Sequence, residues 1–206
     1  MSGVAPDAGL RPGFADPVLD ATRVFRAVMD ATARPGTVRR FAVEGLDPPA
    51  PLTAELAAVA LTLADHEAPL WLDAALARVP AVAAFLRFHT GARVVAEPRA
   101  AAFALVADPL AMPPHDAFHL GTEDDPDLSA TVVVAVDEIA EGDGIALEGP
   151  GIASRAAFAA RPLPPGFAGR LAANRALYPR GADHLLVAPG GRVLGLPRSA
   201  SVVGGG

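Results

Sequence analysis

Residues 52–73, LTAELAAVALTLADHEAPLWLD, give the clearest indication of the class of fold. Its first half is apolar on almost every side, which is typical of a helix buried between other elements. Its last six residues, 68–73, have the short apolar run of a buried strand. A buried helix that leads into a buried strand is a building unit of α/β sheets, so we expect that class of fold.

Residues 16–36, DPVLDATRVFRAVMDATARPG, predict a long helix before this unit. Asp16 suits the capping position and Pro17 suits the first helical position. Pro35 and Gly36 end the pattern. The residues that recur at helical spacing within it are Leu19, Thr22, Phe25, Val28, Met29 and Thr32.

The rest of the chain alternates between the same two kinds of element. We expect helices at 79–92 and 167–179, and strands at 37–43, 101–107, 130–139 and 144–152. Residues 182–202 predict two strands around a turn at 189–191, which makes the sheet mixed rather than purely parallel. The expected molecule is therefore a single α/β domain over residues 14–203, a mixed β-sheet between helices, with flexible segments at 1–13 and 204–206.

Composition excludes several classes of protein. All 17 basic side chains are arginine, which rules out both the lysine of a P-loop and the lysine that binds pyridoxal phosphate (PLP). A net charge of −6 without a basic run argues against nucleic-acid binding. The chain has no cysteine, which favours a reducing compartment, and no uncharged run approaches the roughly 18 residues of a membrane span. We expect a cytoplasmic protein that does not bind membranes.

A first candidate site lies at the end of the helix at 79–92. Arg87, His89 and Thr90 are suited to bind a phosphate, because arginine offers a fork of donors, histidine a donor and threonine a hydroxyl. The alternative is that the two cations complement the negative end of the helix dipole. The same two interpretations apply to Arg34 and Arg198, each of which adjoins a proline.

Other polar groupings allow two interpretations as well. His115 and His119 are four residues apart and would share a helix face as metal ligands, but the prolines before them and the acidic residues after them favour a loop. Residues 149–151, GPG, lack the spacing of a nucleotide-binding loop and indicate a tight turn. Residues 65–67, DHE, form either a catalytic trio or the polar turn between helix and strand.

Six segments then occur together in one order: PVLDATRVFRAVMDATARPG, LTLADHEAPLWL, RFHTGA, LEGPGI, GADHLLV and LPRSASV. In this order and spacing they resemble the PhnH family, the H subunits of the bacterial carbon-phosphorus lyase core complex, over residues 14–203. The resemblance implies a fold similar to that of PLP-dependent transferases, without PLP, and a cytoplasmic protein that is a homodimer when isolated. It also places Asp65 in the shared frame as a structural polar residue, with His66 and Glu67 as solvated neighbours.

The resemblance further implies an activity carried out with other subunits. Family members work with the G and I subunits, assisted by the L subunit, to let a phosphonate displace adenine from ATP, before the J subunit cleaves the carbon-phosphorus bond. Arg34, Arg87, His89 and Arg198 match positions in the family's segments, whereas the two threonines that often follow the last arginine are absent here. No catalytic residue is assigned by the resemblance. The alternative is a subunit that only assembles and shapes its partners.

Overall fold

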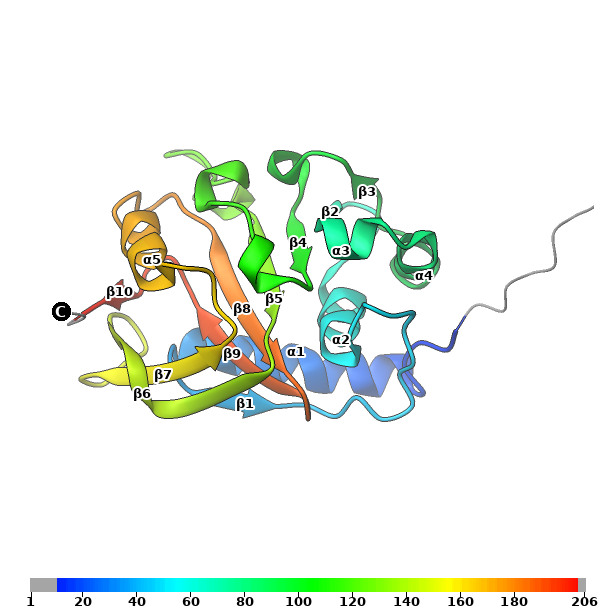
Figure 1. The fold of residues 1–206 in the computed structure, drawn as a ribbon, viewed down its shortest axis with the longest axis horizontal. Coiled ribbons are helices and arrows are strands. Elements are labelled where there is room, and N and C mark those ends of the chain that lie inside the picture. Colours follow the sequence, from blue (N-terminus) through cyan, green and yellow to red (C-terminus); the bar gives the residue numbers. More distant parts are fainter. Residues whose placement is uncertain (1–10, 204–206) are drawn as a thin grey trace, which may run out of the picture.

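The computed structural model describes residues 11–203, and within them the chain forms an α/β fold with a mixed sheet, as expected (Figure 1). The α-helices are α1 (Pro17–Ala33), α2 (Ala54–Leu63), α3 (Ala74–Ala77), α4 (Pro80–Thr90) and α5 (Phe167–Arg175). The strands are β1 (Val38–Arg40), β2 (Leu70–Leu72), β3 (Val94–Val95), β4 (Phe103–Val106), β5 (Thr131–Ala135), β6 (Glu138–Glu148), β7 (Ala156–Arg161), β8 (Asp183–Ala188), β9 (Arg192–Leu196) and β10 (Ser201–Val202). The flexible segments expected at 1–10 and 204–206 lie outside the described residues.

The main sheet has seven strands in the order β1-β9-β8-β5-β4-β2-β3. Strands β8, β5, β4, β2 and β3 are parallel, and the antiparallel pairs β8–β9 and β9–β1 complete one side. From β2 the chain passes outward to β3, whereas from β4 it passes the other way to β5 and β8. The strand order therefore reverses between β2 and β4. We call the side where the parallel strands start the amino edge, and the side where they end the carboxyl edge.

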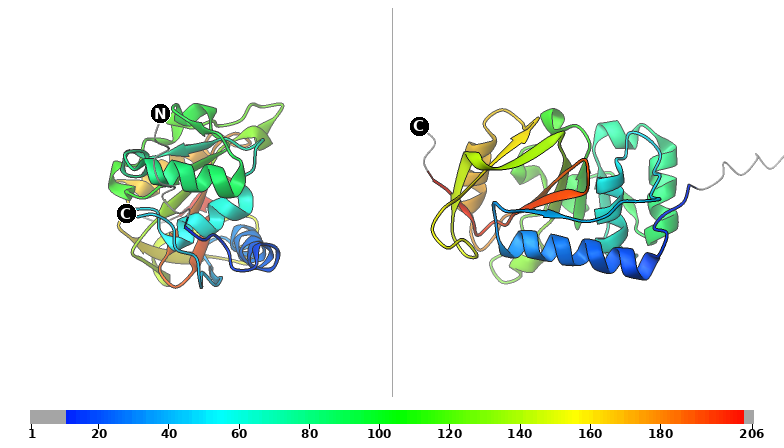
Figure 2. Two further views of the ribbon diagram at one scale, coloured as in Figure 1. Left: turned by 90° about the vertical axis from the view of Figure 1, so that its right-hand side faces the viewer. Right: turned by 90° about the horizontal axis from the view of Figure 1, so that it is seen from below.

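Layers of side chains cover both faces of the main sheet. Along β5, Val133 belongs to the core beneath α1, α2 and α4, whereas Val132 and Val134 belong to the core beneath α5 and a second sheet. This second sheet has three strands in the order β10-β6-β7 and was not expected from the sequence. Two views along other axes show α1 running along one side of the molecule, with the second sheet beyond one end of it (Figure 2).

Helix α1 begins where the sequence predicts. The Asp16 side chain accepts a hydrogen bond from the backbone N–H of Leu19, and Pro17 is the first helical residue. Its buried face, however, differs from the stripe found by spacing. Val28 alone of that stripe is buried, while the core side is made by Val24, Ala27, Val28 and Ala31. Small residues complete this face because the helix packs close to α2 and β9.

The region after β5 departs most from the expectation. The strand predicted at 144–152 is the second half of β6, which starts at Glu138, and β7 was not predicted. Strand β7 has the sequence AAFAAR, whose alanines lack the β-branched character that marks strands. The turn expected at 149–151 is present. Gly151 has a φ of +82°, and a Cβ atom there would lie 2.0 Å from the carbonyl oxygen of Ala33.

Two smaller findings concern the helices. Helix α5 stops at Arg175, short of the predicted end at Pro179, because residues 176–178 form turns. Among the helices within residues 11–203, none combines the length and the apolar character needed to cross a bilayer.

Candidate functional site

Three aspartates lie just after the ends of parallel strands. Asp73 comes after β2, Asp108 comes two residues after β4, and Asp137 comes two residues after β5. Because parallel strands all end on one side of a sheet, the three carboxylates meet at the carboxyl edge. That edge is where ligands bind in open α/β sheets.

The side chain of Asp73 connects two strand ends at this edge by hydrogen bonds. It is 4% exposed, and its Oδ2 accepts hydrogen bonds of 2.8 Å from the backbone N–H groups of both Ala107 and Asp108. Its Oδ1 caps α3 by accepting from the N–H of Leu76 at 3.0 Å. The carboxylate thus joins β2 to β4 where the strand order reverses, so its role in the fold is structural.

A cleft opens beside this junction, over the ends of β4, β5 and β8. Its volume is about 270 Å³, and its lining residues come from those strand ends, the start of α2 and the residue after β7. They are Thr53, Glu55, Ala107, Asp108, Pro109, Ala135, Val136, Asp137, Pro162, Val187, Ala188 and Pro189. We call this the carboxyl-edge cleft.

Glu55 is the most buried acid of the cleft, at 8% exposure. Its Oε1 accepts from the backbone N–H groups of Gly190 and Gly191, at 3.0 and 3.3 Å. These two glycines form the tight turn between β8 and β9, so the carboxylate ties α2 to that hairpin. Within residues 11–203 its second oxygen, Oε2, makes no hydrogen bond, which leaves one acceptor of a buried carboxylate for another group.

The cleft is acidic. Glu55, Asp108 and Asp137 supply three carboxylates, and no arginine is among the lining residues. Arg192 adjoins the rim, but its Nε and Nη1 donate to the carbonyl oxygens of Pro189 and Ile139. Such a cleft favours ligand groups that donate hydrogen bonds or develop positive charge, and it repels phosphates.

The candidates on α4 lie at the opposite, amino edge. The end of α4 adjoins the turn before β2, since a Cβ on Gly91 would lie 3.7 Å from His66 Cβ. His89 Nε2 donates to the carbonyl oxygen of Arg11 (3.1 Å), and the Thr90 hydroxyl donates to that of Leu86 (2.7 Å). Arg87 Nε donates to the carbonyl oxygen of Ala83 within the same helix. Phosphate binding at Arg87, His89 and Thr90 stays a prediction.

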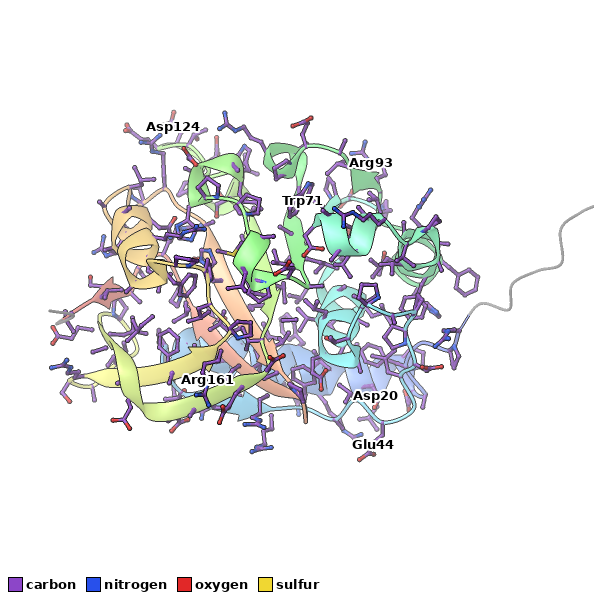
Figure 3. All side chains as sticks on the ribbon, viewed as in Figure 1. Asp20, Glu44, Trp71, Arg93, Asp124 and Arg161 are labelled. Carbon is purple, nitrogen blue, oxygen red and sulfur yellow. The ribbon has the colours of Figure 1, made fainter. Side chains whose placement is uncertain are left out.

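Arg198 also lies at the amino edge, but at its other end. Its backbone N–H donates to Asp183 Oδ1 at 2.7 Å, and its guanidinium contacts Asp183 Oδ2, the Gly181 carbonyl and the Ser129 hydroxyl. Arg34, at the end of α1, pairs with Asp30. The structure therefore does not bring Arg34, Arg87 and Arg198 together. Two residues labelled in Figure 3 help to find the two edges of the sheet. Arg93, beside the start of β3, lies at the amino edge, and Arg161 lies near the carboxyl edge.

The trio at 65–67 is a polar turn. Asp65 Oδ1 accepts from the backbone N–H groups of Glu67 (2.8 Å) and Ala68 (3.0 Å), which orders the turn between α2 and β2. The side chains of His66 and Glu67 are 79% and 84% exposed. The geometry is that of a structural aspartate with two solvated neighbours.

His115 and His119 do not share a helix face. Residues His115–Ala117 form a single 3₁₀ turn, and His119 Nδ1 accepts from the N–H of Gly121. His115 instead packs against His184 of β8, with ring centroids 4.5 Å apart. Within residues 11–203, no cluster of three or more histidine, aspartate or glutamate side chains has an arrangement that could hold a metal ion.

Comparison with known proteins assigns the chain to a family. The family model described as "Bacterial phosphonate metabolism protein (PhnH)" matches residues 12–203. The chain belongs to the PhnH family. It is 43% identical to a protein of Rhizobium meliloti (strain 1021) named alpha-D-ribose 1-methylphosphonate 5-triphosphate synthase subunit PhnH, over 92% of this chain and 93% of that protein.

The carboxyl-edge cleft of this PhnH chain was missed by the sequence reasoning, although part of it left a signal. Three apolar strands each run into an aspartate, at Asp73, Asp108 and Asp137, and parallel strands would place these acids on one side. Glu55 left no such signal, because it is a single acid in an otherwise apolar helix and its partners are 135 and 136 residues away.

Proposed function

We propose that this chain is a subunit of a ribose 1-(alkyl)phosphonate 5-triphosphate synthase, required with the G, I and L subunits for a phosphonate to displace adenine from ATP. The observation that carries the proposal is the 43% identity to a subunit of such a synthase over 92% of the chain. A phosphonate oxygen bonds to the anomeric carbon of ribose while the bond from that carbon to adenine breaks. Adenine leaves with the electron pair and takes up a proton.

The proposal assigns the ribose, rather than the triphosphate, to the carboxyl-edge cleft. Three carboxylates without an arginine suit the ribose hydroxyls, which donate hydrogen bonds, and the positive charge that develops on the ring as adenine departs. Thr53 adds a hydroxyl at the rim. The triphosphate then needs cations from outside the cleft, which a partner subunit would supply.

The alternative assignment uses the amino edge, where Arg87, His89 and Thr90 are the candidates of the sequence, with Arg198 at the far end of the same edge. These residues suit phosphate oxygens better than the cleft does. One ATP molecule in the cleft would not reach them, because the parallel strands separate the two edges. The two assignments therefore make opposite predictions for variants at Arg87 and at Asp137.

The proposal includes no bound cofactor. PLP does not fit this chain, because no lysine exists to form the Schiff base. ATP enters as a co-substrate of the complex, and the fold similarity to PLP-dependent transferases follows from the family resemblance only. We further propose a cytoplasmic protein that is a homodimer when isolated and that joins the G, I, J and L subunits for activity, with no turnover by itself.

The test is phosphonate-dependent release of adenine from ATP by the G, I and L subunits with and without this chain. We expect release only when the chain is present. Equal release without it would leave the alternative function, a non-catalytic assembly subunit of the carbon-phosphorus lyase core complex. A complex that forms and turns over only with the chain, and that loses turnover in cleft variants, would support a direct contact with substrate.

A further inference from the structure

The side of α1 that faces away from the core is apolar. Val18, Phe25 and Met29 are 79%, 47% and 52% exposed, and Thr22 lies between them in the same row. Positions 18, 22, 25 and 29 follow the helical repeat, so these side chains form one continuous stripe about 17 Å long at a rise of about 1.5 Å per residue. Leu19, 45% exposed, widens the stripe at its first turn. We call these five residues the outer face of α1.

The outer face is not needed to complete the core of the fold. The core side of the helix is already complete, since Val24, Ala27, Val28 and Ala31 are all buried against α2 and β9. A helix that is apolar on both sides is typical of one covered on both sides. In Figure 2, α1 lies along the outside of the molecule with no described element over its outer side.

Several arginines lie near the outer face, and not every one of them has an acid of its own in this chain. Arg23 pairs with Asp20, whereas Arg34 and Arg39 share the single carboxylate of Asp30, which balances only one of their two positive charges. Figure 3 labels Asp20 on this helix. Arg26 adjoins Phe25, is exposed, and forms no ion pair within residues 11–203. The apolar outer face thus lies beside Arg26, an arginine that has no acid of its own within residues 11–203.

We propose that the outer face of α1 docks a different subunit of the synthase, through an apolar surface that carries a carboxylate opposite Arg26. The proposal rests on the proposed function, which makes this chain part of a complex. A matching carboxylate is favoured because a desolvated arginine needs an acid, and because aromatic, methionine and arginine side chains are enriched at interface centres.

A second copy of this chain fits the outer face less well. In a two-fold pairing each copy presents the same surface, so both Arg26 side chains would enter one interface. The acids of α1 are not available to them, since Asp20 and Asp30 already bind arginines of their own chain. Charge complementarity therefore favours a different partner.

The test uses the separate variants Phe25→Asp, Met29→Asp and Arg26→Glu, with Leu128→Asp as the matched control. Leu128 is 60% exposed and lies in the 3₁₀ turn Pro126–Leu128, in the segment at the top of Figure 1, whereas α1 lies at the bottom. Each purified variant is mixed with the other purified subunits, and the complex is measured by native mass spectrometry and light scattering. Thermal unfolding of each variant alone shows whether it is folded.

We expect the wild-type chain and Leu128→Asp to join the complex equally, and each folded α1 variant to bind at least about tenfold more weakly. Binding of Phe25→Asp, Met29→Asp and Arg26→Glu at wild-type strength would overturn the proposal. So would an isolated wild-type dimer that the α1 variants dissociate while they still bind the other subunits, because the second copy would then be the occupant. If the wild-type chain itself does not join the complex, the proposed function is overturned first, and the docking proposal with it.

Discussion

The side chain of Asp73 accepts a hydrogen bond from the backbone N–H of Asp108, at 2.8 Å. Asp73 follows β2 and Asp108 follows β4, so this bond spans the place where the strand order of the sheet reverses. In open α/β sheets that place is commonly the crevice where a ligand binds. Here a buried carboxylate fills it, and the cleft lies over the neighbouring strand ends.

Replacing Asp73 by alanine should strongly destabilise the fold. The substitution leaves three backbone N–H groups without their acceptor, and we expect the free energy of unfolding to fall by about 3 kcal/mol, at roughly 1 kcal/mol for each lost bond. Urea unfolding measures the difference. Asp65→Ala is the control, because it removes two such bonds from an exposed turn and should cost about 1 kcal/mol or less. Equal losses in the two variants would contradict the role given to Asp73.

Asp137→Asn tests the carboxyl-edge cleft. The Asp137 side chain lines the cleft and makes no hydrogen bond within residues 11–203, so its charge can be removed without breaking a contact of the fold. We expect adenine release by the assembled complex to fall by about tenfold or more, with unchanged unfolding. Asp127→Asn, which changes an exposed acid outside the cleft, should leave release unaltered. Full activity of Asp137→Asn would remove the case for ribose binding there.

Arg87→Ala separates the two edges of the sheet. If the ribose occupies the carboxyl-edge cleft, release should stay within about twofold of the wild-type rate, since loss of a group that touches neither substrate nor transition state changes kcat and KM little. Steady-state kinetics with ATP as the varied substrate measure this. A large rise in the KM for ATP, with the complex still assembled, would instead favour phosphate binding at the amino edge.

The stability of the fold should fall with pH below about 6.5 because of two buried histidines. Burial lowers the pKa of His184 well below its ordinary value of 6.5, and the nearby His115 lowers it further. Burial also lowers the pKa of His115, where Arg170 and Asp116 are the neighbouring charges. Below pH 6.5 the unfolded chain therefore binds more protons than the folded chain, and stability is lost by up to about 1.4 kcal/mol per pH unit for each histidine.

Urea unfolding between pH 5 and pH 7 measures this slope. His184→Gln should reduce it, because one of the two histidines no longer titrates. His66→Gln is the control, since His66 is 79% exposed and should leave the slope unchanged. A wild-type stability that does not vary over this range would contradict the prediction.

Much of the fold could be predicted because its signals are local. Asp16 with Pro17 starts α1, Gly91 ends α4 with a φ of +73°, and the β-branched run of β5 marks a buried strand. Strand β7 was missed because it is mostly alanine, and its place is set by pairing with β6 in a second sheet. That pairing joins distant residues, and it has no signal of its own in a short window of sequence.

The candidate site was less predictable for a related reason. Asp108 and Asp137 could have been found from their positions after strands, but Glu55 gains its place from Gly190 and Gly191, far along the chain. Arg198 is a candidate from the sequence because it adjoins a proline and matches a position in the family's segments, yet its guanidinium is bonded to Asp183, Gly181 and Ser129. In the sequence, an arginine that the fold uses cannot be told from an arginine that is available to a ligand. The difference is seen only when the acceptors around the guanidinium are known.

If the outer face of α1 docks a partner as proposed, one side of this helix serves folding and the other side serves assembly. Damage to the inner side, for example at Val28, is visible in any measurement on the isolated chain. A substitution at Phe25 would then give a chain that folds by itself but does not join the complex. Such variants would therefore look normal as isolated chains, and their defect would show only when the other subunits are present, in the purified complex or in cells that depend on phosphonates for phosphorus.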